Sequence, residues 1–536
     1  MAAGQCLALF AFIIMKNSKI IALAVAMLAG TMGLLAEHLV ILHTNDTHSQ
    51  IEPEKGGAAG ILQRKAVFDS VRRAEKNVIT VDAGDGVQGS LYFKMFRGDA
   101  DYPLMNMVGY DIRILGNHEF DNGLEDLARY WKQVKGTPLS ANYDFSATPA
   151  KGIFKPYVIK KVGGKKIGFI GLNVDPESLI VADNYKGMKF NPAIKTANEI
   201  ASMLKKEKKC DLVVAVTHIG YDMGDKEDDL KLARDSRDID VIIGGHSHTL
   251  VNPDTPEKTP SLVNNLDGKP VLVAQTGKAG RNVGKIDIDL DKIGKELPRY
   301  SLIPVSNRFD SDHLDGNMQA FLAPYKHKVD SVNNMRVGYV SEDMDGTVRT
   351  GCFPNWAADF GAWYGNLKLD SLRTADSSVP FLDMAIMNVG GIRSSWTKGE
   401  LCKGTVLSTF PFSNRYVVMR IKGSSLIEAM KVAARKGGEA ISHGARVVTD
   451  KDGNLQAMLI DGKPVDPDKE YTVGTIDYLA WGNDDLRTLA DGKVIFTDDV
   501  EIAAPFLRYL KSLDDYGLPV DADSTPRFTV STRTGK

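Results

Sequence analysis

Short apolar runs alternate with helical patterns of hydrophobic residues between residues 37 and 305. Five of these runs are rich in Val, Ile and Leu, and a cluster of polar residues follows each one directly. They are His38–Leu42, Val78–Val81, Asp111–Leu115, Asp211–Val216 and Asp240–Ile243. Apolar runs of this length predict buried strands, and their alternation with helices predicts a layered α/β domain. Open α/β sheets bind ligands outside the carboxyl ends of their strands, so we expect the five polar clusters to converge.

The pattern changes after residue 305. Residues 306–336 carry apolar positions at near-helical spacing, which predicts a connecting helix. Residues 337–536 mix helical and strand patterns and are dense in Gly, Asn and Asp, which indicates a second domain with many turns. A chain of 536 residues is also too long for one ordinary hydrophobic core. The sequence therefore predicts two folded domains, over residues 37–305 and 337–536.

Residues 1–36 differ from the rest of the chain. Lys16 and Lys19 precede the apolar run Ile20–Gly30, and small residues follow up to Ala36. This order predicts a signal peptide that is cleaved near Ala36, and hence a periplasmic or secreted protein with no membrane span after cleavage. The stretch before Met15 is also apolar, so Met15 is an alternative start, and an uncleaved anchor is the alternative to cleavage.

Charge and cysteine content narrow the choice of partners. The 66 basic and 68 acidic residues nearly cancel, so the chain has no bulk electrostatic attraction for nucleic acid or anionic lipid. We therefore expect no nucleic-acid partner. Cys352 and Cys402 are able to pair in an oxidising compartment, although nothing in the sequence demands it, and no cysteine spacing resembles a thiolate metal site. The sequence leaves the oligomeric state open.

The polar clusters contain residue types that bind divalent metal ions. Asp46 and His48 are two residues apart after a predicted strand, and in extended chain both would face the same side. Asp85 lies between two glycines, which permit the tight backbone path needed to aim it inward. The other clusters supply an amide and three imidazoles, from Asn117, His218, His246 and His248. Each cluster alone could be a helix cap or a turn, but five such strand ends are not expected by chance.

This set of ligands predicts chemistry as well as metal binding. Carboxylate, amide and imidazole ligands without thiolates suit Zn, Mn, Fe or Co and argue against a structural zinc site. Seven ligands are too many for one ion and suit two ions that share a carboxylate bridge. Such a pair polarises a phosphoryl oxygen and generates hydroxide near neutral pH, so the sequence predicts hydrolysis of phosphate esters. His118 lies among these residues, and Asp121, three positions on, is placed to orient its ring.

In chain order, these motifs resemble those of the calcineurin-like metallophosphoesterases, in the variant found in the 5′-nucleotidase family. The motifs are Asp46-x-His48, Gly84-Asp85, Gly116-Asn117-His118-Glu119, His218 and Gly245-His246-x-His248. The resemblance covers nearly all of the chain after residue 36. It implies a four-layer sandwich of two mixed sheets flanked by helices, followed by an α+β substrate-binding domain.

The resemblance also implies roles for individual residues. It implies one metal held by Asp46, His48, Asp85 and His248, and a second held by Asp85, Asn117, His218 and His246, with Asp85 as the bridge. His118, paired with Asp121, would stabilise the phosphoryl oxygens or the departing alkoxide in the transition state.

In the second domain the resemblance implies that Arg393 clamps phosphate, Tyr478 stacks on a base and Asp484 accepts ribose hydroxyls. Asn414 belongs to a further matching motif, Pro411-Phe412-Ser413-Asn414. Two departures stand out. Gly482-Asn483-Asp484-Asp485 replaces the family's Gly-Gly-Asp-Gly, and residues 438–444, where a second stacking ring is expected, contain no Phe or Tyr.

Taken together, the sequence predicts an exported enzyme with two divalent metal ions that hydrolyses 5′-nucleotides to nucleoside and phosphate by attack of a metal-bound hydroxide. UDP-sugars, dinucleotides and 2′,3′-cyclic nucleotides are further candidate substrates. One alternative is the same two-metal hydrolysis of a small non-nucleotide ester, such as a sulfur ester. Another is a surface binding protein without turnover, which the complete ligand set disfavours, because a degenerate descendant would have lost some of the seven residues.

Overall fold

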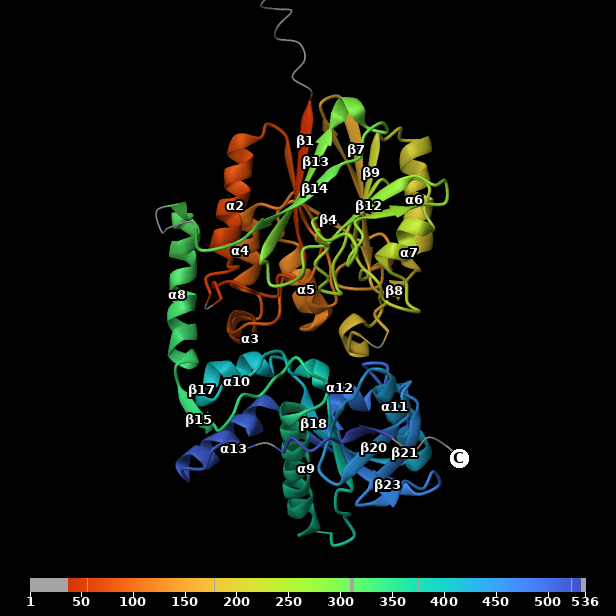
Figure 1. Cartoon of the computed structure of the whole chain (residues 1–536). Helices are drawn as coiled ribbons and strands as arrows, with labels where there is room; N and C mark the ends of the chain where they lie inside the picture. Colours follow the sequence, from red (N-terminus) through yellow and green to blue (C-terminus); the bar gives the residue numbers. More distant parts are fainter. Residues whose placement is uncertain are drawn as a thin grey trace, which may run out of the picture.

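The structure is a computed structural model that describes residues 37–54, 56–177, 179–308, 313–374, 376–521 and 523–531. The predicted signal peptide, residues 1–36, lies outside the described residues. Among the helices that the structure describes, none is long and apolar enough to cross a membrane. Figure 1 shows an N-terminal unit above a C-terminal unit, with helix α8 (Gly316–Asn333) running down one side towards the second unit.

Two six-stranded mixed sheets form the centre of the N-terminal unit. The first contains, in order, β14 (Arg299–Pro304), β13 (Asn282–Asp289), β1 (His38–Thr44), β2 (Val78–Asp82), β3 (Ile112–Ile114) and β4 (Thr137–Leu139). The second contains β11 (Leu262–Asn264), β12 (Pro270–Ala274), β10 (Val241–Ile243), β9 (Leu212–His218), β7 (Lys165–Asn173) and β6 (Tyr157–Val162). Strands β1 to β4 are parallel, as are β12, β10, β9 and β7, so each sheet has a parallel core.

The strands are buried on both faces because helices cover the sheets. In β1, Leu39 and Ile41 pack between the two sheets, whereas Val40 and Leu42 pack on the outer side. Helices α2 (Ile61–Ala74) and α4 (Asp101–Val108) cover the first sheet, and α6 (Ala193–Lys206) and α7 (Asp229–Arg234) cover the second. This arrangement of helix, sheet, sheet and helix confirms the predicted four-layer α/β sandwich.

Helix α8 links the two units. Asp315 caps its first turn, because its carboxylate accepts hydrogen bonds from the backbone N–H groups of Asn317 and Met318. Met318, Leu322 and Val329 pack into the outer core of the N-terminal unit. Near its end, α8 contacts α10 (Lys403–Thr409) of the C-terminal unit. The helix therefore packs against both units.

The C-terminal unit has its own hydrophobic core, formed by helices, two larger sheets and a two-stranded sheet. The larger sheet contains β19 (Ala440–Ile441), β16 (Met384–Met387), β23 (Glu470–Ile476), β18 (Arg415–Lys422) and β24 (Lys493–Glu501). The smaller contains β22 (Lys463–Pro464), β21 (Leu455–Ile460), β20 (Ala445–Thr449) and β25 (Phe528–Val530). Strand β15 (Arg336–Val340) pairs with β17 (Gly399–Cys402). The surrounding helices are α9 (Cys352–Arg373), α10, α11 (Gly423–Arg435), α12 (Asp477–Ala480) and α13 (Ala503–Asp515).

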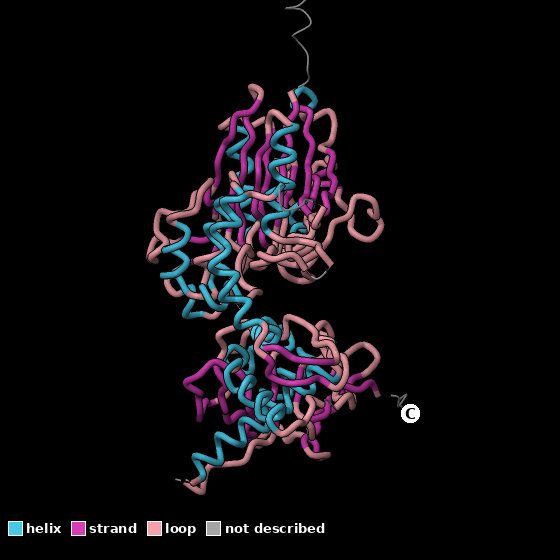
Figure 2. Tube along the Cα trace, turned by 90° about the vertical axis from the view of Figure 1, so that its left-hand side faces the viewer, coloured by secondary structure: helices cyan, strands magenta, loops and turns pink. Residues whose placement is uncertain are grey.

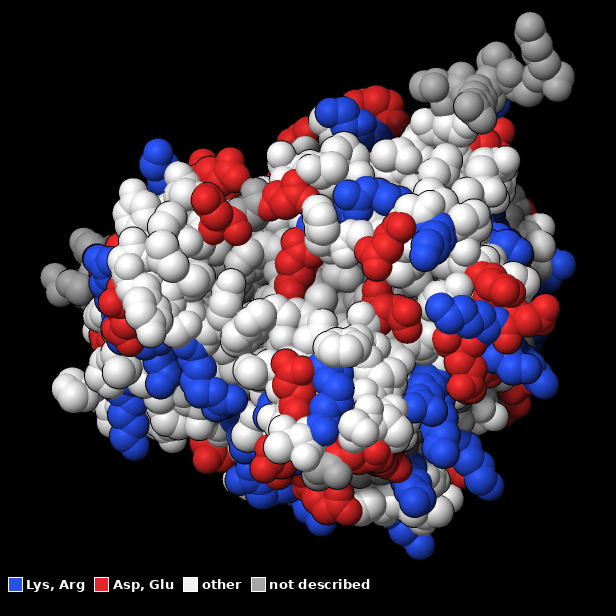
Figure 3. Space-filling view, turned by 90° about the horizontal axis from the view of Figure 1, so that it is seen from below, with Lys and Arg blue, Asp and Glu red and all other residues white. Residues whose placement is uncertain are grey.

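Two features of the surface and the cysteines bear on the sequence predictions. Figure 3 shows acidic and basic side chains intermixed over the lower face of the molecule, in keeping with the nearly balanced charge. Cys210, Cys352 and Cys402 are all free in the described part of the chain, so the permitted pairing of Cys352 with Cys402 is not formed.

Candidate metal centre and substrate pocket

The carboxyl ends of the five predicted strands meet at the end of the N-terminal unit that faces the C-terminal unit. Figure 2 shows the loops gathered at this end. The loop after β1 carries Asp46 and His48, and the loop after β2 carries Asp85. Residues after β3 and β10 and the last residue of β9 supply the rest of the predicted set, namely Asn117, His118, His218, His246 and His248. The expected convergence is therefore present, with strands from both sheets contributing.

The backbone at these residues is not extended, in contrast to the sequence-based expectation for Asp46 and His48. Asp46 has φ 49° and His48 has φ 46°, both in the left-handed region. Asp85, His246 and His248 also have positive φ, although side chains other than glycine rarely adopt it. Long-range hydrogen bonds hold these turns: Asp46 N–H donates to the Gly84 carbonyl, and His48 N–H donates to the Asp85 carbonyl, each at 2.9 Å. Strained backbone of this kind clusters at functional sites.

Two glycines allow the loops to approach one another this closely. Gly84 has φ +87°, and a Cβ there would lie 2.6 Å from the backbone nitrogen of Gly116. A Cβ on Gly245 would lie 2.7 Å from Nδ1 of His218. Any larger residue at these positions would push apart the loops that carry Asp85, His218 and His246.

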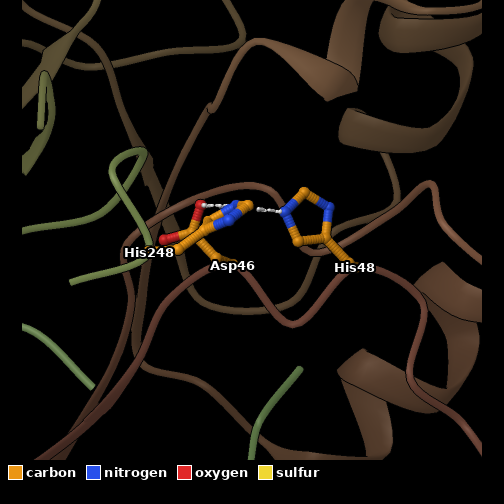
Figure 4. Close-up of side chains that lie close together, drawn as sticks. All are labelled: Asp46, His48 and His248. Atoms are coloured by element: carbon orange, nitrogen blue, oxygen red, sulfur yellow. Dashed lines mark hydrogen bonds and ion pairs between the residues drawn. The ribbon is translucent and has the colours of Figure 1, made fainter. Parts of the chain in front are cut away.

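Asp46, His48 and His248 form the first group of candidate metal ligands, shown in Figure 4. The Nε2 atoms of His48 and His248 lie 2.9 Å apart, and Nε2 of His248 lies 3.5 Å from Oδ1 of Asp46. Burial lowers the pKa of His248 to about 3 and lowers that of His48 well below its usual value, so both rings are neutral near pH 7. Neutral imidazoles and a carboxylate that share one small space suit a divalent cation.

The second group consists of Asp85, Asn117, His218 and His246. Nε2 of His218 lies 3.2 Å from Oδ2 of Asp85, and Nδ1 of His246 lies 2.9 Å from Oδ1 of Asn117. Nδ1 of His218 contacts the Ala83 carbonyl at 2.8 Å, which directs Nε2 towards the centre of the group. Within the described residues, this buried Nε2 forms no well-aligned hydrogen bond, although it lies beside the Asp85 carboxylate.

The electrostatics of the cluster call for positive charge at its centre. Burial raises the pKa of Asp46 to about 7. Burial by itself would lower the pKa of His218, but the nearby Asp85 and Asp46 carboxylates raise it to about 10. Asp46, Asp85 and His218 also form a triad whose ligand atoms lie within 4.8 Å of one another, and this triad joins the two groups. The donor set, with the buried Nε2 of His218 directed towards the Asp85 and Asp46 carboxylates, thus fits divalent metal ions.

Glu119 is a structural element of the site that the sequence analysis did not single out. Its buried carboxylate accepts hydrogen bonds from the backbone N–H groups of Asp85, Gly86 and Gly116, at 3.1, 2.9 and 2.5 Å. It therefore fastens the loop after β2 to the loop after β3. In the sequence, the signal that could have identified Glu119 was its place in the motif Gly116-Asn117-His118-Glu119. No local pattern predicts that its carboxylate binds the N–H groups of another loop.

His118 lies at the boundary between the metal ligands and the second unit. Its Nδ1 contacts the Asp121 carboxylate at 3.1 Å, so the contact expected from their spacing is present. Burial lowers the pKa of His118, but the Asp121 and Asp85 carboxylates outweigh it and raise the pKa overall. The ring stacks on Phe412 of the C-terminal unit, with centroids 5.8 Å apart.

A cavity of about 570 Å³ lies between the two units, and residues from both units line it. The N-terminal wall includes Asp85, Asn117, His118, His246 and His248, whereas Asp46, His48 and His218 are not among the lining residues. On the opposite wall lie all four residues that the resemblance assigned to substrate, namely Arg393, Asn414, Tyr478 and Asp484. The structure thus brings these four residues to the cavity that the metal-ligand candidates also border.

The C-terminal wall carries aromatic rings, although residues 438–444 supply none of them. In residues 438–444, Ala440 and Ile441 form β19 and are fully buried, and residues 438–442 are all buried, whereas His443 is exposed. Phe412 lines the cavity instead, together with Tyr478 and Trp481. The sequence showed Phe412 as part of the motif Pro411–Asn414, but it did not predict that the ring lines the cavity.

The departure at residues 482–485 also has a structural consequence. Asp484 and Asp485 both have positive φ, at 58° and 62°. Nζ of Lys436 lies 3.1 Å from Asp484 and 3.0 Å from Asp485, and Lys226 of the N-terminal unit lies 3.2 Å from Asp485. Asp485 therefore connects the two units.

Comparison with known proteins agrees with this architecture. Residues 39–250 match the family model of the calcineurin-like phosphoesterases, and residues 339–491 match that of the 5′-nucleotidase C-terminal domain. The chain therefore belongs to the 5′-nucleotidase family of two-domain metallophosphoesterases, as the resemblance predicted. It is a hydrolase of phosphoric esters.

Individual relatives extend over most of the chain. The chain is 27% identical over 525 residues to the 5′-nucleotidase of Bos taurus, covering 89% of each protein. It is 29% identical to the trifunctional nucleotide phosphoesterase protein YfkN of Bacillus subtilis, covering 86% of this chain but 32% of that protein. The solved structure of the 5′-nucleotidase precursor from Thermus thermophilus is 29% identical, with a TM-score of 0.79, and covers 92% of this chain and 100% of that chain.

Proposed function

We propose that the protein is an exported phosphoesterase that uses two divalent metal ions to hydrolyse 5′-nucleotides to nucleoside and phosphate. The observation that carries this proposal is the composition of the cavity. One wall presents ligands for two metal ions, and the other presents a guanidinium and aromatic rings. The volume of about 570 Å³ lies in the range of cavities that enclose small organic ligands.

The N-terminal wall would carry out the chemistry. Asp46, His48, Asp85 and His248 would hold one ion, and Asp85, Asn117, His218 and His246 would hold the other. When bound, such ions polarise a phosphoryl oxygen and activate water for attack on phosphorus. Because Asp121 holds Nδ1 of His118, Nε2 is the nitrogen that remains to donate a hydrogen bond to a phosphoryl oxygen or to the leaving oxygen.

The C-terminal wall would bind the nucleotide. The Arg393 guanidinium matches the geometry of phosphate oxygens. Tyr478 and Phe412 offer apolar faces to a base, and the carboxylate of Asp484 and the amide of Asn414 are able to hydrogen-bond ribose hydroxyls. The same relatives support this assignment, since the bovine and Thermus proteins are both described as 5′-nucleotidases.

A substrate screen tests the proposal. Residues 37–536 are produced, stripped of metal with a chelator, and restored with Mn, Zn, Co or Fe. Activity is measured on AMP, UMP, UDP-glucose, a dinucleotide, 2′,3′-cyclic AMP and an aryl phosphate. We expect hydrolysis of AMP or UMP only after metal is restored. Cleavage of the aryl phosphate alone would remove the nucleotide assignment, and hydrolysis of none of these esters would refute the proposal.

Export is a separate part of the proposal and has its own test. It rests on the basic, apolar and small-residue order of residues 1–36. Expression of the full chain followed by N-terminal sequencing of the protein outside the cytoplasm should find a start near Glu37. An unprocessed chain that stays in the cytoplasm would contradict it.

A further inference from the structure

Gln88 has an unusual environment for a polar residue. It lies in the loop between Asp85 and helix α3 (Leu91–Phe96), and it is one of the residues that line the cavity. Only 1% of its surface is exposed, yet neither Nε2 nor Oε1 has a hydrogen-bond partner among the described residues. Buried side-chain amides are nearly always paired, so each unpaired one requires an explanation.

The loop that carries Gln88 is firmly held, so its conformation is not that of a free segment. Glu119 binds the N–H groups of Asp85 and Gly86 on one side. On the other side, the Ser90 hydroxyl caps α3 and contacts the Ser49 hydroxyl at 2.6 Å. Between these anchors Gln88 adopts φ +69°, a left-handed conformation that is unfavourable for a residue with a side chain. The fold thus maintains both backbone strain and an unpaired amide at this position.

Most other unpaired buried atoms in the described residues have a different setting; the exception is Oδ1 of Asn388, which is unpaired in a residue that lines the cavity from the C-terminal unit. Nε2 of His218, which forms no well-aligned hydrogen bond, belongs to the candidate metal ligands. Arg64 and Gln63 also have unpaired atoms, but both lie on α2 and neither lines the cavity. Gln88 lines the cavity and lies outside the ligand set, and its whole amide is unpaired. A ligand in the cavity is therefore the partner that would satisfy it.

We propose that Gln88 binds the phosphoryl group of the substrate, with Nε2 donating a hydrogen bond to a phosphoryl oxygen. Gln88 belongs to the same wall as Asn117 and His118, three residues after Asp85, whereas Tyr478 and Asp484 belong to the opposite wall. Its position thus favours contact with phosphate rather than with the nucleoside. A phosphate dianion only accepts hydrogen bonds, which suits the amide N–H, and Oε1 is left for a water molecule or a protonated phosphoryl oxygen. The inference rests on the proposed phosphoesterase function.

Replacement of Gln88 by methionine provides the test. Gln88→Met keeps the length of the side chain and removes both polar atoms, and Gln88→Glu adds a negative charge that would repel phosphate. Gln63→Met is the matched control, because Gln63 is also buried with an unpaired Oε1 but lies outside the cavity. Binding of inorganic phosphate to the manganese-loaded protein is measured by calorimetry, and thermal unfolding is measured without metal.

We expect Gln88→Met to raise the Kd for phosphate on the order of tenfold, because a hydrogen bond to a charged group is lost. The increase in Kd for Gln88→Glu should be at least as large. The melting temperature of Gln88→Met should be unchanged or higher, since an unpaired buried polar group is removed. Gln63→Met should leave the Kd within twofold of the unmodified protein. A phosphate Kd within twofold for Gln88→Met overturns the inference, and so does an absence of phosphate binding by the unmodified protein.

Two further results separate this inference from the proposed function. If Gln88→Met weakens phosphate binding but the unmodified protein hydrolyses no nucleotide, the role of Gln88 stands and the nucleotide assignment fails. If AMP is hydrolysed and Gln88→Met binds phosphate normally, only the inference about Gln88 fails. Should Gln88→Met not fold, Gln88→Asn is judged by the same Kd criterion, since its shorter side chain withdraws the amide from phosphate.

Discussion

The two walls of the cavity are built in different ways. On the N-terminal wall, backbone conformation sets the positions of the candidate ligands. Hydrogen bonds between the loops, and from backbone N–H groups to the Glu119 carboxylate, hold that backbone. On the C-terminal wall, partly exposed side chains face the cavity and bond locally, as Arg393 does to the Gly390 carbonyl at 3.5 Å. Backbone hydrogen bonds therefore fix the positions of the ligands on the first wall, whereas fewer such bonds hold the side chains on the second, and we expect those side chains to adjust to a ligand.

This difference indicates that the N-terminal wall carries out catalysis and that the C-terminal wall determines substrate specificity. Catalysis by metal ions requires ligands held within a fraction of an ångström, which buried loops with several backbone hydrogen bonds provide. Recognition of a nucleoside tolerates side chains that adapt. Substitutions in the N-terminal wall should therefore lower kcat for every ester, and those in the C-terminal wall should raise KM for nucleotides alone.

The largest effect is expected from His118→Asn. Loss of a group that hydrogen-bonds the reacting oxygens should lower kcat roughly 10²- to 10⁴-fold for AMP and for a small alkyl phosphate alike. Metal content, measured by elemental analysis, should not change, because His118 is outside the seven candidate ligands. A fall in kcat for AMP alone would contradict the division of roles between the two walls, since it would place His118 in nucleoside binding.

An intermediate effect is expected from Tyr478→Ala. Stacking of a base on an aromatic ring contributes about 1–3 kcal/mol, so KM for AMP should rise about five- to a hundredfold. The kinetics for a small alkyl phosphate, which has no ring to stack, should be unchanged. Phe412→Ala serves as the parallel variant, and its ring also contacts His118, so some loss of kcat is expected in addition. Equal loss on both substrates for Tyr478→Ala would contradict a role in base binding.

The smallest effect is expected from the contacts between the two walls. Nζ of Lys94 lies 2.5 Å from Oε2 of Glu501 and 3.4 Å from the Ser413 hydroxyl, so Lys94 joins α3 to the C-terminal unit. Lys94→Met should change kcat/KM only about two- to threefold at low salt, because part of the pair is exposed. The difference should shrink at high ionic strength, where such pairs are screened.

Lys76→Met is the control for this variant. Lys76 is highly exposed and pairs with Glu37 within the N-terminal unit, so its loss should not alter activity at any salt concentration. A large effect of Lys94→Met that persists in high salt would mean that Lys94 acts on the substrate itself.

Much of the N-terminal unit could be predicted because its signals are local. All five predicted strands are present, since a continuous run of Val, Ile and Leu reports burial on both faces wherever the strand lies in the sheet. The identity of the candidate ligands followed from the residues after those strands. Their conformation did not follow: Asp46 and His48 occupy left-handed turns, because the distant loop of residues 84–86 supplies their hydrogen bonds.

The C-terminal unit was harder to interpret. Residues 438–444 match a family position for an aromatic ring, yet residues 438–442 are buried in the C-terminal unit, with Ala440 and Ile441 paired to β16 as β19. Phe412 takes a place at the cavity, and nothing in its neighbours along the chain distinguishes a ring in the core from a ring at the wall. Gln88 is similar, because its missing partners become apparent only once the surrounding side chains are placed.

By itself the sequence determined the α/β class of the N-terminal unit and the chemical types available for two metal ions, because hydrophobic periodicity and residue identity are properties of short segments. Tertiary structure alone decided which side chains share the cavity. Phe412 meets His118, and Asp485 meets Lys226, through the packing of two units that are distant along the chain. Such contacts depend on how the two units pack, and no pattern within a single segment encodes that.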